Sequence, residues 1–426
     1  MQPLVHTDHP FVEAPAAISG STSAHPPLRR GTLENPALVL CSGSNGLGAI
    51  RSLARAGVPT IAVGENWDEP GLVSRYPQKT MYVSGADRTG REASLLRLLA
   101  NVADRQPVLI PTSDFFASFL ARHRKQLARS FHFCLPAGEL IELLIDKDRE
   151  TREIQRMGIP LPKTLQDLPP SRADFAEALG VPCIIKPRTF RDAEKVGRKN
   201  FVLRTPADVE SFYRGYGQRL DSFIAQELIP GADEMLWVCN GTFNHSHDLI
   251  EGFTFRRLRL CPSHFGVTSY AISERNDEVL RLVARLGKSL KYTGPAMVEF
   301  KFDARDETYK YIELNPRLGL CNFFDTTCGI NNVWHTYRLA LGIDVAPSGK
   351  AQQEGVMYLS LLQDLPARLS DGESLASILH HYFSNRNKKH VEPFFNLQDL
   401  MPVTRLVARI VRRRILGRTH AQENAS

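Results

Sequence analysis

The sequence MVEFKFDARDETYKYIELNPR, residues 297–317, decides the fold class and contains the first candidate site. Apolar and polar residues alternate in its first run, which places Glu299 on the polar face of a strand. A second alternating run includes Glu313, and the polar residues 303–308 between the runs are typical of a turn. We therefore expect an antiparallel hairpin that is held from behind by apolar side chains.

The difference in position between Glu299 and Glu313 is even, so an odd-length loop would set them side by side on one face. Adjacent carboxylates raise one another's pKa, and a divalent cation would remove that cost. Magnesium prefers oxygen ligands and completes its shell with water and phosphate. Asn315 adds an amide oxygen, and Arg317 can grip phosphate or carboxylate. The alternative is a solvated face on which Lys301 and Arg317 pair with the acids.

Length and composition predict a soluble, cytoplasmic protein. The chain has 426 residues, 42% of them hydrophobic, which is enough for about two to three domains. Its net charge of +7 is dispersed and is not interleaved with aromatic residues, so we expect no nucleic-acid partner. Seven scattered cysteines without a CxxC motif predict free thiols in a reducing compartment. No apolar run is long enough to span a membrane, and residues 1–35 predict a disordered leader.

An α/β unit opens the ordered part of the chain. The sequence ALVLCSGSNGLGAIRSLARAGVPTIAVGEN, residues 37–66, predicts a strand, a glycine-rich turn, a helix and a second strand. Its GxxGxG spacing differs from the dinucleotide GxGxxG, but Glu65 lies where a ribose-binding acid would be, so nicotinamide binding stays an alternative. A later buried strand ends on Thr112, Ser113 and Asp114, which could grip a polar substrate or simply cap the next helix.

Basic residues in the middle of the chain are candidates for binding anions. Lys186 leaves a buried apolar strand and could contact a phosphate, or snorkel to the surface. Residues 188–200 are rich in cations, which predicts either a mobile lid over a polyanion or a solvated hairpin tip. Arg257, Arg259 and His264 could line a carboxylate or phosphate pocket, or the arginines could line an exposed edge strand.

Two further segments carry clear patterns. The dipeptide Asn240-Gly241 predicts a tight hairpin turn. The C-terminal part is predicted to be α-rich and ends in MPVTRLVARIVRRRILGR, residues 401–418, which has an apolar stripe, six arginines and no acid. A helix docked on its own protein with a solvated basic face is favoured there, and peripheral membrane contact is the less favoured alternative.

Taken in order, these parts resemble the ATP-grasp superfamily, and specifically its carboxylate–amine ligase branch, which includes D-aspartate ligases and relatives of carbamoyl phosphate synthase. The resemblance runs over residues 36–330. The motifs that carry it are SGSNGLGAIRSLARAGV, LIDKDRETREIQRMGIPLPKT, CIIKPR, AQELIPGADE, and VEFKFD with IELNPR.

The resemblance implies a mixed α/β and α+β chain. A Rossmann-like pre-ATP-grasp domain over residues 36–140 would follow the leader. An ATP-grasp core of two α+β subdomains would cover residues 141–345, with its lid subdomain at about 182–255. An α-rich, helical extension would complete the chain over residues 346–426.

The resemblance also assigns roles to residues. Lys147 and Lys186 would contact the phosphates or the adenine edge of ATP, and Glu234 would bind the ribose. Arg317 would steady the transferred phosphate, with Arg257 and Lys186 as further catalytic residues. The adenine hinge would comprise Gln226, Glu227, Leu228 and Ile229, and the ligands of magnesium, or of manganese in its place, would be Glu299, Glu313 and Asn315.

The implied reaction joins a small carboxylate to an amine. The carboxylate would attack the γ-phosphate of ATP to form an acyl phosphate, and the amine would then displace phosphate to give an amide. A homodimer is compatible with this interpretation. One departure is that the segment after Lys186, which is usually glycine-rich, has Gly197 alone. The alternatives are an ATP-dependent carboxylase or carbamoyl-phosphate-type enzyme, and a regulatory ATP-binding protein without turnover.

Overall fold

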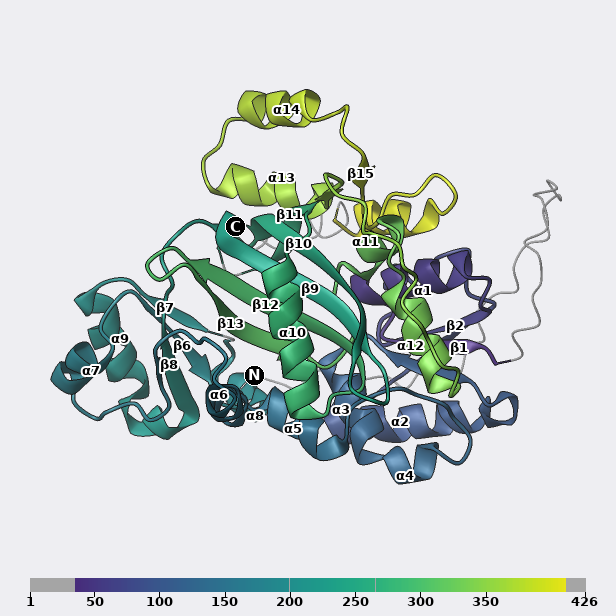
Figure 1. Ribbon diagram of the computed structural model, residues 1–426, viewed down its shortest axis with the longest axis horizontal. Coiled ribbons are helices and arrows are strands. Elements are labelled where there is room, and N and C mark those ends of the chain that lie inside the picture. Colours follow the sequence, from purple (N-terminus) through teal and green to yellow (C-terminus); the bar gives the residue numbers. More distant parts are fainter. Residues whose placement is uncertain (1–34, 199, 265, 411–426) are drawn as a thin grey trace, which may run out of the picture.

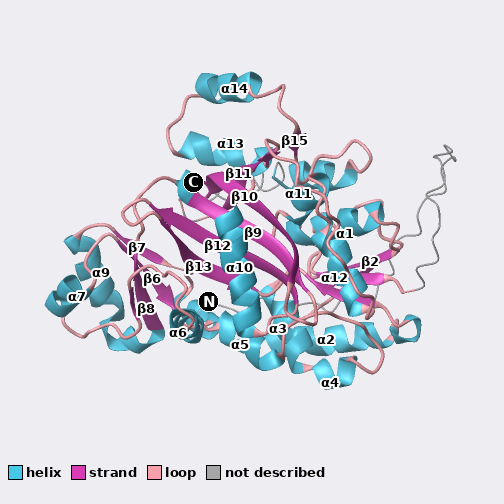
Figure 2. Cartoon of the chain, in the orientation of Figure 1, coloured by secondary structure: helices cyan, strands magenta, loops and turns pink. Residues whose placement is uncertain are grey.

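The computed structural model describes residues 35–410 apart from 199 and 265, and this part of the chain contains three β-sheets (Figure 1). Helices lie on the faces of the sheets, and the largest sheet occupies the centre of the molecule (Figure 2). The expected mixed architecture of α/β and α+β parts is confirmed. Residues 1–34 of the predicted leader and the arginine-rich residues 411–418 lie outside the described residues.

The N-terminal sheet has four parallel strands in the order β3-β2-β1-β4. Its central strands are fully buried apolar runs, as parallel strands covered by helices require. The glycine-rich turn before α1 is tight, because a Cβ on Gly46 would lie 2.1 Å from the carbonyl oxygen of Cys41. The elements of this unit are β1 (Ala37–Leu40), α1 (Ser44–Arg55), β2 (Thr60–Gly64), β3 (Lys79–Tyr82), α2 (Arg88–Ala100), η1 (Ala103–Arg105), β4 (Val108–Pro111), α3 (Asp114–Arg122) and α4 (Arg124–Leu127).

The second sheet is antiparallel, in the order β5-β8-β6-β7, and is reached through α5 (Gly138–Ile145) and α6 (Lys147–Arg156). An aromatic cluster that includes Phe175, Phe212 and Phe223 forms its core. The other elements of this unit are β5 (Thr164–Leu165), α7 (Arg172–Ala178), β6 (Cys183–Pro187), α8 (Phe190–Val196), β7 (Phe201–Leu203), α9 (Pro206–Tyr216), η2 (Gly217–Ser222) and β8 (Phe223–Glu227).

One expectation for this region differs from the structure. The second sheet runs from residue 164 to residue 227, and the lid range of about 182–255 stays a prediction. The basic segment after Lys186 is not a continuous loop or a hairpin tip, because it contains α8. The Thr189 side chain accepts a hydrogen bond from the backbone N–H of Asp192, and Gly197 ends the helix in the left-handed conformation with φ of 70°.

The central sheet has seven strands in the order β13-β12-β9-β10-β11-β14-β15. All neighbouring strands are antiparallel except β14 and β15. Helix α10 packs its apolar stripe on one face, and α11 covers part of the other. Its strands and the adjoining elements are η3 (Asp233–Met235), β9 (Leu236–Phe243), β10 (Leu249–Cys261), β11 (Val267–Ser273), α10 (Asp277–Leu290), β12 (Gly294–Asp303), β13 (Thr308–Asn315), α11 (Asn322–Thr327), α12 (Asn332–Ala340), β14 (Met357–Leu359) and β15 (His390–Val391).

The expected turn at Asn240-Gly241 is wrong, because both residues lie inside β9 and the chain reverses at residues 244–248. Asn240 is buried there and donates a 2.9 Å hydrogen bond to Asp325 of α11. A buried partner 85 residues away satisfies a side chain that would otherwise favour a turn.

The C-terminal extension combines helices with the two strands β14 and β15, so it is not purely helical. It contains α13 (Leu361–Ser370), α14 (Leu375–Ser384) and a helical stretch over residues 401–410. Leu406 and Ile410 of that stretch line a cavity of about 270 Å3 together with Gly43 and Ser44 at the start of α1, so this part of the expected terminal helix faces α1. No described helix is long and apolar enough to cross a membrane.

Candidate active site

The hairpin formed by β12 and β13 brings the two predicted acids together. Its register pairs Glu299 directly with Glu313, and Met297 with Asn315, so the expected arrangement of the strands is confirmed. A β-bulge follows Glu299. Glu299 is only 7% exposed, on the face of the sheet opposite α10.

Arg257 on β10 holds Glu299 from the same sheet face. Its Nη1 and Nη2 atoms donate to the two carboxylate oxygens at 2.8 and 2.5 Å, a bidentate arrangement that fixes the acid. Burial raises the pKa of Glu299 above its ordinary value and the charge of Glu313 adds to this, while Arg257 opposes both. Arg257 is therefore buried at the centre of the sheet and does not line an exposed edge strand.

Lys147, the first residue of α6, faces the second acid. Its Nζ donates to Glu150 at 3.0 Å and to Glu313 at 3.5 Å. Burial alone would raise the pKa of Glu313, but Lys147, the Asn315 amide and Lys186 outweigh it and hold this pKa at about 2. Glu313 is therefore an anion at neutral pH.

Lys186 approaches from the second sheet, at the end of β6. Its Nζ donates to Gln226 Oε1 of β8 at 3.0 Å, and Gln226 in turn donates to Thr164 at 3.1 Å. Burial and the charge of Lys147 lower the pKa of Lys186, whereas Glu313 opposes this. The two lysines and the acid pair thus interact electrostatically where the second and central sheets meet.

The predicted adenine hinge, residues 226–229, is braced by charged side chains. The Glu227 carboxylate accepts from the Lys163 backbone N–H at 2.9 Å and from Arg305 at 3.1 Å. Lys301 donates to the carbonyls of Ile229 at 2.8 Å and Gly231 at 2.9 Å. Lys301 is therefore bound to the hinge backbone, and the alternative that it pairs with the hairpin acids is wrong. The backbone N–H of Leu228 donates to the carbonyl of Pro182.

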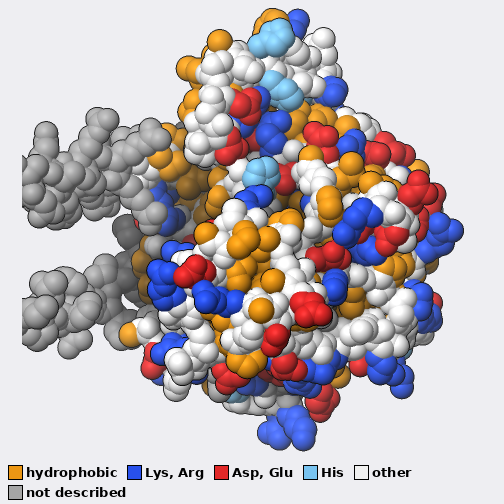
Figure 3. Space-filling model, turned by 90° about the vertical axis from the view of Figure 1, so that its left-hand side faces the viewer, with side chains coloured by type: hydrophobic (Ala, Val, Ile, Leu, Met, Phe, Trp, Pro, Cys, Tyr) orange, Lys and Arg blue, Asp and Glu red, His pale blue; other side chains and the backbone are white. Residues whose placement is uncertain are grey.

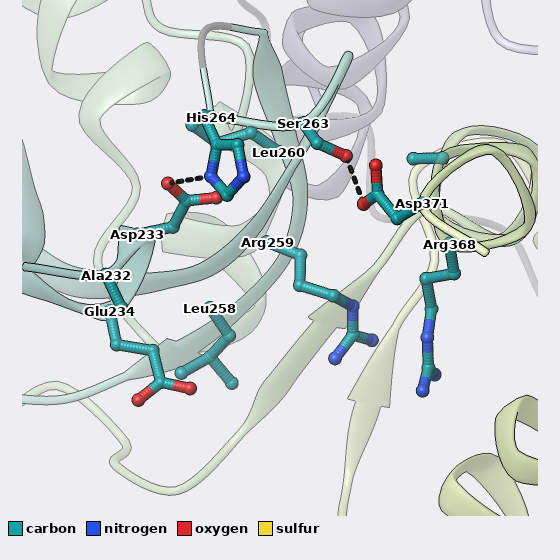
Figure 4. A pocket seen from close by; sticks show the side chains of 11 residues that line it. Ala232, Asp233, Glu234, Leu258, Arg259, Leu260, Ser263, His264, Arg368 and Asp371 are labelled. Carbon is teal, nitrogen blue, oxygen red and sulfur yellow. Dashed lines mark hydrogen bonds and ion pairs between the residues drawn. The ribbon is translucent and has the colours of Figure 1, made fainter. Parts of the chain in front are cut away.

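Glu234, the predicted ribose-binding acid, lies on η3 at the edge of a cavity of about 200 Å3 (Figure 4). On one side of the same cavity, His264 Nδ1 lies 3.2 Å from Asp233 Oδ1 (Figure 4). Arg259, expected as a ligand for carboxylate or phosphate, donates instead to both oxygens of the buried Asp364 at 2.8 and 2.7 Å. That ion pair joins β10 to α13 and so gives Arg259 a structural partner.

Arg317 connects the hairpin to the carboxyl ends of the parallel strands. It donates to Asp114 at 2.7 Å and to the Asn315 side-chain oxygen at 3.1 Å. The Thr112 hydroxyl lies within hydrogen-bond distance of the backbone carbonyls of Leu40 and Cys41, to which it can donate. Ser113 is the N-cap residue of α3, but its side chain makes no capping bond, and its buried hydroxyl has no hydrogen-bond partner among the described residues.

The donor set of the hairpin fits magnesium. In the described part of the chain, no group of three or more His, Cys, Asp or Glu could hold a metal ion. The candidate ligands on the hairpin are two carboxylates and one amide. Magnesium is commonly held by one or two carboxylates, with water and phosphate oxygens as its other ligands. Each oxygen of Glu299 and Glu313 can accept more than one bond, so their contacts with Arg257, Lys147 and Asn315 leave capacity for an ion.

Sequence reasoning missed Glu150, which organises the site from behind. This buried acid accepts from Lys147, from the Tyr311 hydroxyl at 2.5 Å and from the Leu314 backbone N–H at 3.0 Å. Its position three residues after Lys147 on one helix was the available signal, since residues at that spacing share a face. The contacts with β13, more than 160 residues away, carry no local signal.

Comparisons with known proteins find similarity in sequence and in fold. No protein-family model matches the chain. It is 26% identical over 239 residues to the D-aspartate ligase of Enterococcus faecium (strain Aus0004), a match covering 53% of this chain and just over half, 56%, of that relative.

Solved structures are similar over about three quarters of the chain. The biotin carboxylase domain of Hydrogenobacter thermophilus 2-oxoglutarate carboxylase, a dimer in complex with MgADP, ADP and bicarbonate, has a TM-score of 0.60 at 16% identity and covers 76% of this chain and 73% of its own. Campylobacter jejuni biotin carboxylase has a TM-score of 0.60 at 18% identity, and the match covers 76% of this chain and 74% of that one. Staphylococcus aureus N5-carboxyaminoimidazole synthetase has a TM-score of 0.56 at 13% identity, and the match covers 74% of this chain and 78% of that one. The chain thus has the ATP-grasp fold, and its predicted resemblance to the carboxylate–amine ligase branch of the ATP-grasp superfamily is confirmed.

Proposed function

We propose that this protein is an ATP-dependent carboxylate–amine ligase that forms an amide through an acyl phosphate. The observation that carries the proposal is the pairing of Glu299 with Glu313 opposite Lys147 and Lys186, at the junction of two sheets. Two acids that face two lysines are suited to bind a nucleoside triphosphate together with a divalent cation. The D-aspartate ligase relative supports a ligase of this chemical class.

In this proposal Lys147 and Lys186 bind the phosphates of ATP as point charges, and residues 226–229 hold the adenine. Lys301 keeps that hinge in place through two backbone carbonyls. Glu234 binds the ribose. Glu299, Glu313 and Asn315 would hold magnesium, or manganese in its place, which neutralises phosphate charge when bound.

The bond changes need no protein nucleophile. A substrate carboxylate oxygen attacks the γ-phosphorus, the bond to the β-phosphate oxygen breaks, and ADP leaves. The amine nitrogen then attacks the acyl carbon, phosphate leaves, and the amine loses a proton. Arg317 steadies the transferred phosphoryl group, and Arg257 fixes the orientation of Glu299.

The free state of the described cysteines supports the proposed cytoplasmic location, since thiols persist in a reducing compartment. The two substrates enter this proposal by class alone, as a small carboxylate and an amine. A homodimer stays a prediction.

An ADP-release screen tests the function. Purified protein with ATP and magnesium would receive amino acids and small carboxylates singly and in pairs, with bicarbonate as a separate arm. We expect ADP only with a matching pair, and a product mass equal to the two substrates minus water. Bicarbonate-stimulated ADP release without an amine would instead indicate a carboxylase. Tight ATP binding without ADP in every arm would indicate a regulatory protein.

A further inference from the structure

Helix α14 presents an apolar stripe that the described part of the chain does not cover. Leu375, Leu379 and Phe383 recur every four residues and so follow one side of the helix. They are 53%, 57% and 63% exposed, whereas Ile378 is the buried residue of this helix. Three large apolar side chains in one row on one short helix form a contiguous exposed patch, which in soluble proteins commonly marks an interaction site.

The stripe and the chain that follows it are basic, whereas the two acids just before it have partners of their own: Glu373 pairs with Arg368, and Asp371 accepts from Ser263. From Ser374 to Val391 the sequence has no Asp or Glu, but it has three Lys or Arg residues and three His residues. Arg386 lies 3.8 Å from the ring centre of Phe383, so one cation sits directly at the end of the stripe. Figure 3 shows hydrophobic, histidine and basic side chains gathered at the top of the molecule, where α14 lies.

The helix has a firm attachment beneath this surface. The Tyr382 hydroxyl donates to the buried Asp364 at 2.7 Å, and Asp364 also holds Arg259 of β10. Tyr382 and Ile378 therefore bind the inner side of α14 to the body of the protein, and the apolar stripe is left on the outer side. The stripe is therefore exposed although the helix that carries it is attached to the protein.

The charge of this surface distinguishes between three candidate partners: a second copy of the chain, a nucleic acid and a lipid surface. A second copy placed on this face by a two-fold axis would bring two acid-free, basic segments together, which is unfavourable. A nucleic acid would use the cations but would leave the aliphatic side chains exposed. An anionic lipid surface satisfies both, because its headgroups attract lysine and arginine while the acyl boundary receives leucine and phenylalanine.

We propose that α14 binds the surface of an anionic lipid bilayer, with Leu375, Leu379 and Phe383 inserted at the acyl boundary and Arg386 and Lys388 among the headgroups. The contact is peripheral and lies on a different element from the arginine-rich residues 401–418. It is independent of the proposed ligase activity, because none of these five residues belongs to the candidate active site.

Vesicle flotation of the full-length protein tests the proposal. Vesicles of phosphatidylcholine with phosphatidylserine are expected to carry the protein upward, and vesicles of phosphatidylcholine alone are expected to bind about tenfold less. The variant L379S/F383S should lower the partition coefficient on anionic vesicles by about tenfold or more, because two inserted side chains are lost. The variant R386E/K388E should lose the preference for phosphatidylserine.

The matched control is W67S/I343S, which removes two exposed apolar side chains elsewhere on the protein and should float like the wild type. Circular dichroism of each variant shows whether the fold is kept. Failure of the wild type to float with anionic vesicles would overturn the proposal, and so would wild-type flotation of folded L379S/F383S. Wild-type self-association that L379S/F383S abolishes, without flotation, would assign the stripe to a second copy.

Discussion

Glu299 and Glu313 lie opposite one another, yet their surroundings differ. Arg257 holds both oxygens of Glu299, whose pKa is nonetheless raised by burial, whereas Glu313 is kept ionised by Lys147 and its other cationic neighbours. Glu313 is therefore the acid that offers a negative charge at neutral pH toward the two lysines proposed to bind phosphate. Loss of that charge at constant shape should act on turnover more than on folding.

We predict that Glu313→Gln lowers ADP release by about 100-fold or more while thermal unfolding changes little, because an amide supplies weaker electrostatic support for a cation. Steady-state ADP release with the pair of substrates from the screen measures the effect. Glu307→Gln, an exposed acid in the same hairpin, is the matched control and should turn over like the wild type. Full turnover by E313Q would contradict the metal assignment.

Lys186 is expected to act mainly on nucleotide affinity. Its ammonium group is half-buried, bonded to Gln226 and subject to the charge of Lys147, so it is held in position before any ligand binds. Lys186→Ala should raise the Kd for ATP by about tenfold or more, the cost of one charged hydrogen bond. Isothermal titration calorimetry measures it, with the exposed Lys125→Ala of α4, outside the candidate active site, as the control. An unchanged Kd in K186A would remove the phosphate role.

At the scale of elements, the alternation of polar and apolar residues predicted the strands whose pairing depends on neighbouring residues in the sequence. The hairpin of β12 and β13, with its two acids on one face, follows from period-two alternation in a single stretch. Asn240 shows the limit, since its turn preference yields to a buried hydrogen bond with α11. Arg259 and Lys301 show it again, because a distant carboxylate and a hinge carbonyl, both invisible in the local pattern, decide what these cations bind.

The attachment of α13 and α14 to the central sheet depends on Asp364. Burial would raise the pKa of this carboxyl, but hydrogen bonds and charge from Arg259, with Tyr382 and Ser269, hold it below its usual value. An acid with a lowered folded pKa stabilises the protein above its unfolded pKa, and that contribution is lost as the pH falls through the folded value.

We therefore predict that Asp364→Asn lowers the free energy of unfolding by about 3 kcal/mol at pH 7, since it leaves Arg259 without its counter-ion. Urea denaturation at several pH values measures this, and the difference from wild type should shrink below about pH 4. Glu210→Gln, which breaks the exposed pair with Arg214 on α9, is the control and should cost less than about 1 kcal/mol. A difference that grew toward low pH would contradict the ionised pair.

At the scale of the whole molecule, the extension ties the N-terminal and central sheets together. It adds β14 and β15 to the central sheet and also reaches α1, where the buried Arg51 donates to Asp399 at 3.1 Å and to the carbonyls of Pro393 and Phe394. Arg317 makes a second junction through Asp114, next to the candidate active site. The first junction is remote from the acids and lysines and should therefore affect cohesion without directly affecting their chemistry.

Replacement of Asp399 should separate these roles. We predict that Asp399→Ala lowers the free energy of unfolding by about 3 kcal/mol, because Arg51 stays buried without its carboxylate, and that it speeds hydrogen exchange in residues 390–410 first. The affinity for ATP should stay near the wild-type value, since the lysine and acid cluster keeps its contacts. Arg75→Ala is the control, because the bond from its backbone N–H to Asp399 is kept and only an exposed bond from its guanidinium to the Gln398 carbonyl is lost. Exchange that rose equally throughout the central sheet would show that the extension is part of one cooperative unit with it.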